Sequence, residues 1–252
     1  MSTKINQLIK LWKPGLVFTS SFLKKEGINY DQQFAYKKSG WLESIGSGAF
    51  KKEGDLINWS GGLYALQNQL NLGIHLGGKS ALIKQGYSHY AYVQEPNLFL
   101  FLSRDNKLPK WFRNYDWGIK LELSRTALLP ADLEDSYTTT NIDGFEIKTS
   151  IPERAVLEML YYIPLKQGFD EAIKIVDFMN SLRPEKVQML LELCTSVKVK
   201  RLFLYMAEKQ DHFWYKELNL DKINLGTGNR MIVKNGIFDT KYKITVPREN
   251  QE

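Results

Sequence analysis

Glycine and proline divide the first 52 residues into segments that are too short for anything but small helices and hairpin strands. Pro14-Gly15, Gly27 and Gly40 each interrupt the chain after a short run, and Gly46-Ser47-Gly48 forms a further break. Such residues end helices and form tight turns. The N-terminal region is therefore restricted to a small bundle of short helices with an attached hairpin.

The first helix is predicted from apolar spacing. Ile5, Leu8, Ile9 and Trp12 lie three or four residues apart, which places them on one face of a helix over residues 4–12. That face can pack against the rest of the bundle.

Capping residues predict two further helices. A second short helix starts at Thr19 or Ser20, whose hydroxyls can accept hydrogen bonds from its free N–H groups. Asn29 can cap a third helix over residues 30–38, and Gly40 suits the left-handed residue that ends it. Three helices therefore fit within forty residues.

A hairpin is predicted after the third helix, from strand-like residues 41–45 and 49–52 around the glycine-rich tip at 46–48. Three helices followed by a hairpin with a basic edge is the element order of a winged helix-turn-helix. We therefore expect an α+β fold, with an N-terminal winged helix-turn-helix followed by a mixed α/β C-terminal domain. We expect the domains at 1–92, with a core at 1–56, and at 93–252.

Helical and strand-like patterns alternate along the rest of the chain, which contains no internal repeat. Residues 133–140 are polar and predict a loop, and Ser150 with Glu153 suggests a capping box for a helix that runs to Tyr162. Helices are also predicted at 60–70, 80–85, 187–194 and 199–206, and strands at 98–102, 119–123, 145–148, 230–233 and 242–246.

Net charge favours a polyanionic partner. The chain carries +6, and residues 1–59 hold 9 basic against 5 acidic residues, so +4 of the excess lies in this short segment. No apolar run approaches the roughly 18 residues of a membrane span, and the N-terminus lacks a secretory signal, so we expect a cytoplasmic protein with no membrane partner. Cys194 is the single cysteine, which excludes an internal disulfide.

In a winged helix-turn-helix, the third helix enters the major groove of double-stranded DNA, while the second helix and the wing contact phosphates. Amides can pair with adenine, and hydroxyls and lysines suit the backbone. A solvated helix face is the alternative for each side chain. The candidate DNA-binding residues are Thr19, Ser20, Ser21, Tyr30, Gln32, Gln33, Tyr36, Lys37, Lys38, Ser47, Lys51 and Lys52.

Residues 73–80, Gly-Ile-His-Leu-Gly-Gly-Lys-Ser, match the P-loop pattern. A working P-loop follows a buried strand, whereas residues 63–72 read as helical, so we expect a glycine turn at Gly77-Gly78 with Ser80 capping a helix. A nucleotide-binding enzyme that uses this segment remains the alternative function.

No catalytic residue, cofactor or metal site is predicted. The three histidines, His75, His89 and His212, lack ligand spacing, and a structural role is expected for His89. Lys198, Lys200 and Arg201 form the densest basic cluster of the C-terminal part, which can be a second surface for an anion or partner, or simply a solvated face.

Ordered sequence blocks across nearly the whole chain resemble the AbiEi family of antitoxins. They are residues 28–50, Gly77-Gly78-Lys79-Ser80-Ala81-Leu82, Gly86-Tyr87-Ser88-His89-Tyr90, Leu108-Pro109-Lys110-Trp111, Ser150-Ile151-Pro152-Glu153-Arg154-Ala155, Leu182-Arg183-Pro184, Lys198-Val199-Lys200-Arg201-Leu202-Phe203 and Leu225-Gly226-Thr227-Gly228-Asn229-Arg230.

The resemblance implies a non-enzymatic antitoxin of a type IV toxin-antitoxin pair, linked to abortive phage infection. Its winged helix would repress the promoter of the pair at inverted repeats in double-stranded operator DNA. The functional partner would be an AbiEii-like nucleotidyltransferase toxin, which the C-terminal domain counteracts without a stable complex between the two proteins. The resemblance also makes the P-loop match a structural glycine turn.

Overall fold

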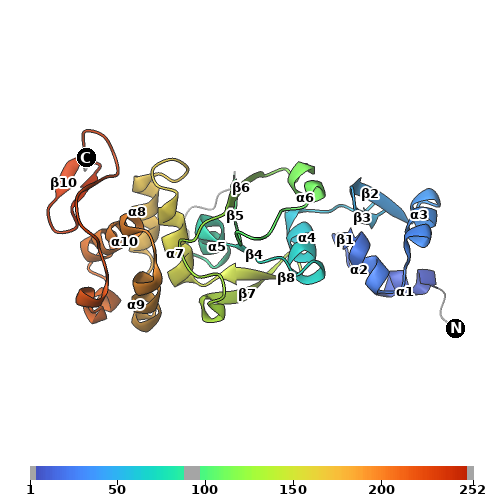
Figure 1. Ribbon diagram of the computed structural model, residues 1–252, viewed down its shortest axis with the longest axis horizontal. Helices are drawn as coiled ribbons and strands as arrows, with labels where there is room; N and C mark the ends of the chain where they lie inside the picture. The colour runs from blue at the N-terminus through green and yellow to red at the C-terminus, as the bar shows by residue number, and fades with distance from the viewer. Residues whose placement is uncertain (1–3, 88–96, 249–252) are drawn as a thin grey trace. The chain divides into compact units, whose positions relative to one another are not determined.

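The computed structural model describes residues 4–87 and 97–248 (Figure 1). The chain divides into two compact units. The first comprises Met1–His75, Pro96–Ser124 and Thr139–Lys148, and the second comprises Leu76–Glu95, Arg125–Thr138 and Thr149–Glu252. The unit that holds residues 1–56 thus includes segments that lie beyond residue 92 in the sequence.

The N-terminal region contains three short helices and a three-stranded antiparallel sheet of order β1-β3-β2. The three predicted helices and the hairpin are present, and β1 adds a strand that was not predicted. The elements are α1 (Lys4–Lys10), β1 (Phe18–Thr19), α2 (Ser20–Lys25), α3 (Tyr30–Lys38), β2 (Leu42–Gly46) and β3 (Ala49–Lys52).

Local capping fixes the ends of these helices. The Thr19 hydroxyl accepts a hydrogen bond from the Phe22 N–H at 3.3 Å and so caps α2. Asn29 and Gln32 form a reciprocal capping box at the start of α3, with N···O distances of 2.9 and 3.0 Å. Gly40 follows α3 with φ of 74°, the left-handed conformation that was predicted.

The next five strands of the chain form one sheet, in the order β6-β5-β4-β8-β7. β5 and β6 pair in parallel, as do β4 and β8 through Leu76 and Thr149. Its strands are β4 (Ile74–Leu76), β5 (Asn97–Leu102), β6 (Lys120–Ser124), β7 (Tyr137–Ile142) and β8 (Phe145–Ser150). The first unit also contains α4 (Trp59–Tyr64), the π-helix η1 (Ala65–Gln69) and α6 (Lys110–Asn114).

Helices dominate the second unit, where Leu160, Val176, Leu190 and Phe203 are buried in one apolar core. A small sheet of order β10-β11-β9 completes the unit. The elements are α5 (Gly78–Lys84), η2 (Glu134–Ser136), α7 (Pro152–Tyr161), α8 (Phe169–Asp177), α9 (Pro184–Leu193), α10 (Val197–Lys209), η3 (Phe213–Glu217), η4 (Leu220–Lys222), β9 (Arg230–Met231), β10 (Ile237–Asp239) and β11 (Ile244–Val246).

Two local predictions are wrong. Residues 133–140 do not form a loop, because η2 and most of β7 occupy them. The predicted capping box is also absent, since α7 starts at Pro152 and the Ser150 hydroxyl donates to Glu158 at 2.8 Å. Glu153 instead accepts two hydrogen bonds from the Arg183 side chain, at 2.8 and 3.0 Å. Both carboxylates thus serve tertiary contacts.

Candidate nucleic-acid interface

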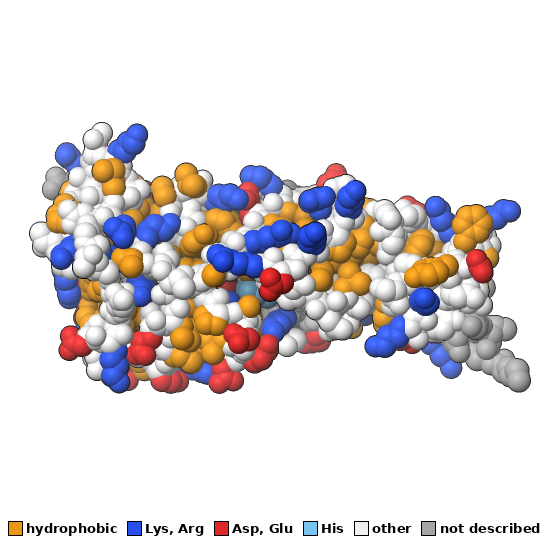
Figure 2. Space-filling view, viewed as in Figure 1, with side chains coloured by type: hydrophobic (Ala, Val, Ile, Leu, Met, Phe, Trp, Pro, Cys, Tyr) orange, Lys and Arg blue, Asp and Glu red, His pale blue; other side chains and the backbone are white. Residues whose placement is uncertain are grey.

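One face of α3 is exposed and combines aromatic rings with lysines. Tyr30 and Phe34 lie one turn apart and are 59% and 71% exposed, and Lys37 and Lys38 continue the same exposed side. From α2, the Lys24 ammonium lies 5.0 Å from the centre of the Tyr30 ring. Figure 2 shows hydrophobic side chains beside lysines over this part of the chain. The face presents positive charge and flat apolar surface together.

The buried side of α3 is held by Gln33, a predicted candidate for base contact. Gln33 is 2% exposed, so that prediction is corrected. Its amide N–H groups donate to the carbonyls of Ser20 (3.0 Å) and Ile28 (2.9 Å), and its carbonyl accepts from the Ser20 hydroxyl at 2.5 Å. Because these contacts use both ends of the amide, Gln33 fixes α3 against α2 and is not placed to read DNA.

Two other candidates on α3 are half-buried. The Gln32 carbonyl accepts the Asn29 N–H in the capping box, so the amide end of this side chain has less freedom to turn toward a ligand. Tyr36 is also half-buried, and its backbone carbonyl accepts the Trp41 N–H at 2.9 Å. Neither is as accessible as Tyr30 or Lys37.

The three hydroxyl candidates at the start of α2 differ in accessibility. Thr19 is buried and caps the helix, and its backbone N–H donates to Gln69 at 2.8 Å. The Ser20 hydroxyl donates to Gln33. Ser21 is the exposed member of the three. Thr19 and Ser20 are therefore structural, which corrects their expected role as phosphate ligands.

The hairpin presents Ser47 and Lys52 to solvent. The Lys52 ammonium lies 4.5 Å from the centre of the Trp12 ring. Lys51 is less available than expected, because its ammonium contacts the Glu43 carboxylate at 3.1 Å and donates to the Asp55 carbonyl at 3.0 Å. The hairpin therefore offers a ligand fewer available lysines than the sequence predicted.

The tip of the hairpin is braced by α6, through Gly46. Gly46 has φ of 145°, and a Cβ built on it would lie 2.8 Å from the Trp111 Cβ. Only a residue without a side chain allows the two backbones to approach so closely. Trp111 is 4% exposed, so α6 supports β2 from the interior side of the first unit.

The candidates that the structure leaves exposed are thus Ser21, Tyr30, Lys37, Lys38, Ser47 and Lys52. Sequence reasoning missed Phe34 and Lys24. No signal in the sequence indicated Phe34, because an aromatic residue in a helix usually lies on the buried face, whereas the buried residue of α3 is Gln33. Lys24 is visible only when α2 and α3 are placed together.

The P-loop-like segment is filled by protein side chains. A short strand, β4, does precede α5, but it occupies residues 74–76 inside the motif, so no open loop separates strand from helix. The Gly78 N–H donates to the Glu158 carboxylate at 3.0 Å, and Lys79 pairs with Glu171. A carboxylate therefore holds the position that a phosphate would need. Ser80 lies within α5 and does not cap it, contrary to expectation.

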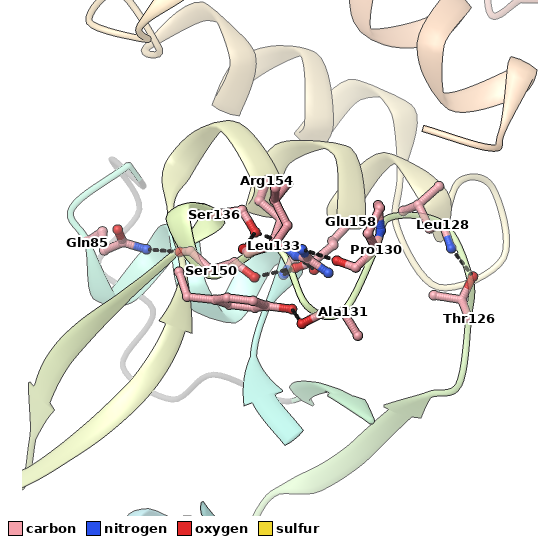
Figure 3. A network of polar contacts seen from close by, with 12 residues as sticks. Gln85, Thr126, Leu128, Pro130, Ala131, Leu133, Ser136, Ser150, Arg154 and Glu158 are labelled. Atoms are coloured by element: carbon pink, nitrogen blue, oxygen red, sulfur yellow. Dashed lines mark hydrogen bonds and ion pairs between the residues drawn. The ribbon is translucent and has the colours of Figure 1, made fainter. Parts of the chain in front are cut away.

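Glu158 belongs to a buried polar network (Figure 3). It accepts hydrogen bonds from Arg154 and Ser150 at 2.8 Å each, and Arg154 also donates to the Ser136 hydroxyl and the Pro130 carbonyl. Burial raises the pKa of nearby Tyr137 to about 12, although the Arg154 guanidinium, 4.5 Å from the ring centre, opposes the rise. The network joins α7 to the preceding segment and has the character of structural packing.

The C-terminal basic cluster is not a surface, which corrects that prediction. Lys200 and Arg201 are 4% and 2% exposed. Arg201 donates to the carbonyls of Leu225, Gly226, Gly228 and Lys243, so its guanidinium organises the final segments. Lys198 donates to the carbonyls of Tyr161 and Ile163, and burial lowers its pKa.

The described histidines have structural surroundings. His75 is buried and stacks on Phe101 with ring centres 5.6 Å apart. His212 is buried between Asn180 and the Val176 carbonyl, whereas His89 lies outside the described residues. Within residues 4–87 and 97–248, no three histidine, cysteine or acidic side chains form a group able to hold a metal ion. No helix in these ranges has the length and apolarity needed to span a membrane.

Comparisons with known proteins agree with this architecture. The chain is similar to the RV2827C protein from Mycobacterium tuberculosis, whose crystal structure superposes with a TM-score of 0.65 at 15% identity over 97% of this chain and 91% of the other. At that identity the likeness concerns the fold. No curated protein matches the chain.

Two family models match consecutive parts of the sequence. Residues 1–93 match a model described as the N-terminal domain of the AbiEi antitoxin, a transcriptional regulator. Residues 95–247 match a model described as a transcriptional regulator and AbiEi antitoxin of type IV toxin-antitoxin systems. Together they cover almost the entire chain, which therefore belongs to the AbiEi antitoxin family of transcriptional regulators.

Proposed function

We propose that this protein binds double-stranded operator DNA through an N-terminal winged helix-turn-helix and represses its own operon. The DNA-binding domain of this proposal spans residues 1–92, with its core at 1–56. The observation that carries it is the exposed surface of α3, where Tyr30, Lys37 and Lys38 are open to solvent while Gln33 is buried and anchors the helix.

The order of α2, α3 and the β2–β3 hairpin supports this geometry. The major groove of DNA admits one α-helix, and α3 has an accessible basic surface at Lys37 and Lys38. Ser47 and Lys52 on the hairpin are then suited to contact phosphates beside the groove. Because regulators of this kind bind as symmetric pairs, we expect an operator with inverted repeats.

We further propose that the remaining residues, 93–252, act as the antitoxin domain. The family description supports an antitoxin of a type IV system. In this proposal the chain counteracts a nucleotidyltransferase toxin without acting as an enzyme, and the two proteins do not form a stable complex. The carboxylate contact at Gly78 gives no support to nucleotide binding at residues 73–80.

The DNA-binding half is tested by titrating the full chain against the DNA upstream of its own operon and against a scrambled fragment of equal length. Lys37→Ala and Lys38→Ala should each weaken binding to both fragments. Each should also reduce the slope of log affinity against log salt by about one, the value for one lost phosphate contact. Lys174→Ala removes an exposed lysine of α8 and is the matched control, with no expected change.

Equal affinity for the operator and the scrambled fragment at physiological salt would refute repression by specific binding. The antitoxin half needs a separate measurement, namely growth of cells that express the neighbouring toxin with and without this chain. Rescue of growth without co-purification of the two proteins is the expected result. A stable, stoichiometric complex would contradict the proposed mode of action.

A further inference from the structure

Polar and apolar residues on α3 are exchanged relative to an ordinary surface helix. Gln33 is 2% exposed, whereas its neighbour Phe34 is 71% exposed. A surface helix normally buries its apolar residues and leaves its amides in water. Burying a phenylalanine side chain stabilises a fold, and α3 forgoes this contribution at Phe34.

Phe34 is not a scattered surface residue, because it is part of a cluster. The Tyr30 ring lies one helical turn before it, and Lys24 covers the Tyr30 ring at 5.0 Å. Lys37 and Lys38 flank the cluster on its C-terminal side. Two exposed aromatic side chains flanked by lysines indicate a ligand that is anionic at its edges and has apolar groups between them.

The major groove of DNA has this character, since phosphates border a floor on which thymine alone presents a methyl group. Gln33 is buried and the Gln32 carbonyl caps α3, so these two amides are less able to hydrogen-bond with the edges of bases. The rings are therefore the accessible groups that can distinguish one base pair from another by an apolar contact.

We infer that Phe34 and Tyr30 recognise thymine methyl groups in the major groove of the operator. This inference rests on the proposed DNA-binding function and adds to it the chemistry that is read. Lysines 24, 37 and 38 hold the backbone on either side, and the rings select steps that carry thymine. The operator half-sites should accordingly contain thymine opposite the N-terminal half of α3.

The test removes the methyl groups without changing the base pairing. The upstream DNA is amplified once with thymidine triphosphate and once with deoxyuridine triphosphate, and the full chain is titrated against both products. Loss of one buried methyl corresponds to about 0.8 kcal/mol, so binding should weaken about fourfold for each methyl contacted. A scrambled fragment, prepared in both forms, measures binding that does not depend on sequence.

Variants identify the residue that senses the methyl group. Phe34→Ala should bind the thymine and uracil fragments with nearly equal affinity, about tenfold more weakly than the unchanged protein binds the thymine fragment. Phe34→Leu keeps an apolar contact and should restore part of the difference. Lys37→Ala should weaken both fragments by the same factor. Phe213→Ala removes another ring, 76% exposed, and should leave the ratio unchanged.

Three results overturn the inference in different ways. If the unchanged protein prefers its upstream DNA over the scrambled fragment but binds thymine and uracil forms equally, the proposed function stands and methyl recognition is wrong. If it has no preference for its upstream DNA, both fail. Should Phe34→Ala instead abolish a concentration-dependent dimer in sedimentation, with no thymine preference in the parent, the ring contacts a second copy of the chain.

Discussion

Replacing Gln33 with alanine tests whether this residue holds α3 in place or reads a base. The side chain makes three hydrogen bonds, two part-buried ones to Ser20 and a buried one to the carbonyl of Ile28. Each such bond contributes about 1 kcal/mol net, so their combined loss should cost about 3 kcal/mol. That is a large part of the 5–15 kcal/mol that ordinarily stabilises a domain.

Tryptophan fluorescence during urea unfolding measures this loss in the appropriate unit. Five of the six tryptophans lie in the first unit, namely Trp12, Trp41, Trp59, Trp111 and Trp117. The matched control is Gln32→Ala, which removes one exposed capping contact and should cost less than about 1 kcal/mol. The preference for upstream over scrambled DNA, measured well below the unfolding transition, should survive in Gln33→Ala.

The opposite pattern would refute this reasoning. If Gln33→Ala unfolds within about 0.5 kcal/mol of the unchanged protein and loses tenfold or more of its DNA preference, the amide contacts a base. A base contact is worth about 1–3 kcal/mol of discrimination between base pairs. The two interpretations therefore differ by a measurable amount in both the unfolding free energy and the DNA preference.

Two further predictions concern the hairpin and the second unit. Gly46→Ala should destabilise the first unit by about 1–3 kcal/mol and weaken DNA binding, because the added Cβ would overlap Trp111. A Cβ at Gly48 has no neighbour within 4 Å, so Gly48→Ala should cost less. Equal unfolding midpoints of the two variants in urea would contradict the contact between Gly46 and α6. Burial alone would raise the pKa of Glu153, but hydrogen bonds from Arg183 outweigh it and hold the pKa below the ordinary 4.5. The stabilising contribution of this carboxylate should therefore be complete above about pH 4.5 and decline below it. The unfolding free energies of Glu153→Gln and the unchanged protein should then converge in acid. A difference that stays constant with pH would contradict a stabilising ion pair between Glu153 and Arg183.

Local signals predicted the N-terminal elements well. The expected bounds of the third helix agree with α3 because both of its ends depend on neighbours in the sequence, Asn29 before it and Gly40 after it. The hairpin was equally visible, since its glycine tip and flanking strands lie within a dozen residues. These are features that a short window of sequence contains.

Burial of polar groups could not be predicted in the same way. Arg201 reads as a solvated residue in a basic run, and only carbonyls from residues 225–243 make its burial possible. The P-loop match fails for a similar reason, because Glu158, eighty residues later, occupies the Gly78 N–H. β7 looked like a loop because its threonines face solvent while their backbone pairs with β8.

The candidate site illustrates how these two kinds of information combine. The fold of the hairpin is local, but its support is not, because Trp111 belongs to a segment that follows residue 95 and falls within the second family match. Since β2 lacks a side chain at Gly46, the backbone rests directly on α6, and any shift of α6 must move the hairpin or open a gap beneath it. The geometry that exposes Lys52 and Ser47 is therefore set by residues on both sides of the boundary between the two matches. In the proposed complex, the first unit has to fold as a whole before α3 and the hairpin can contact DNA together.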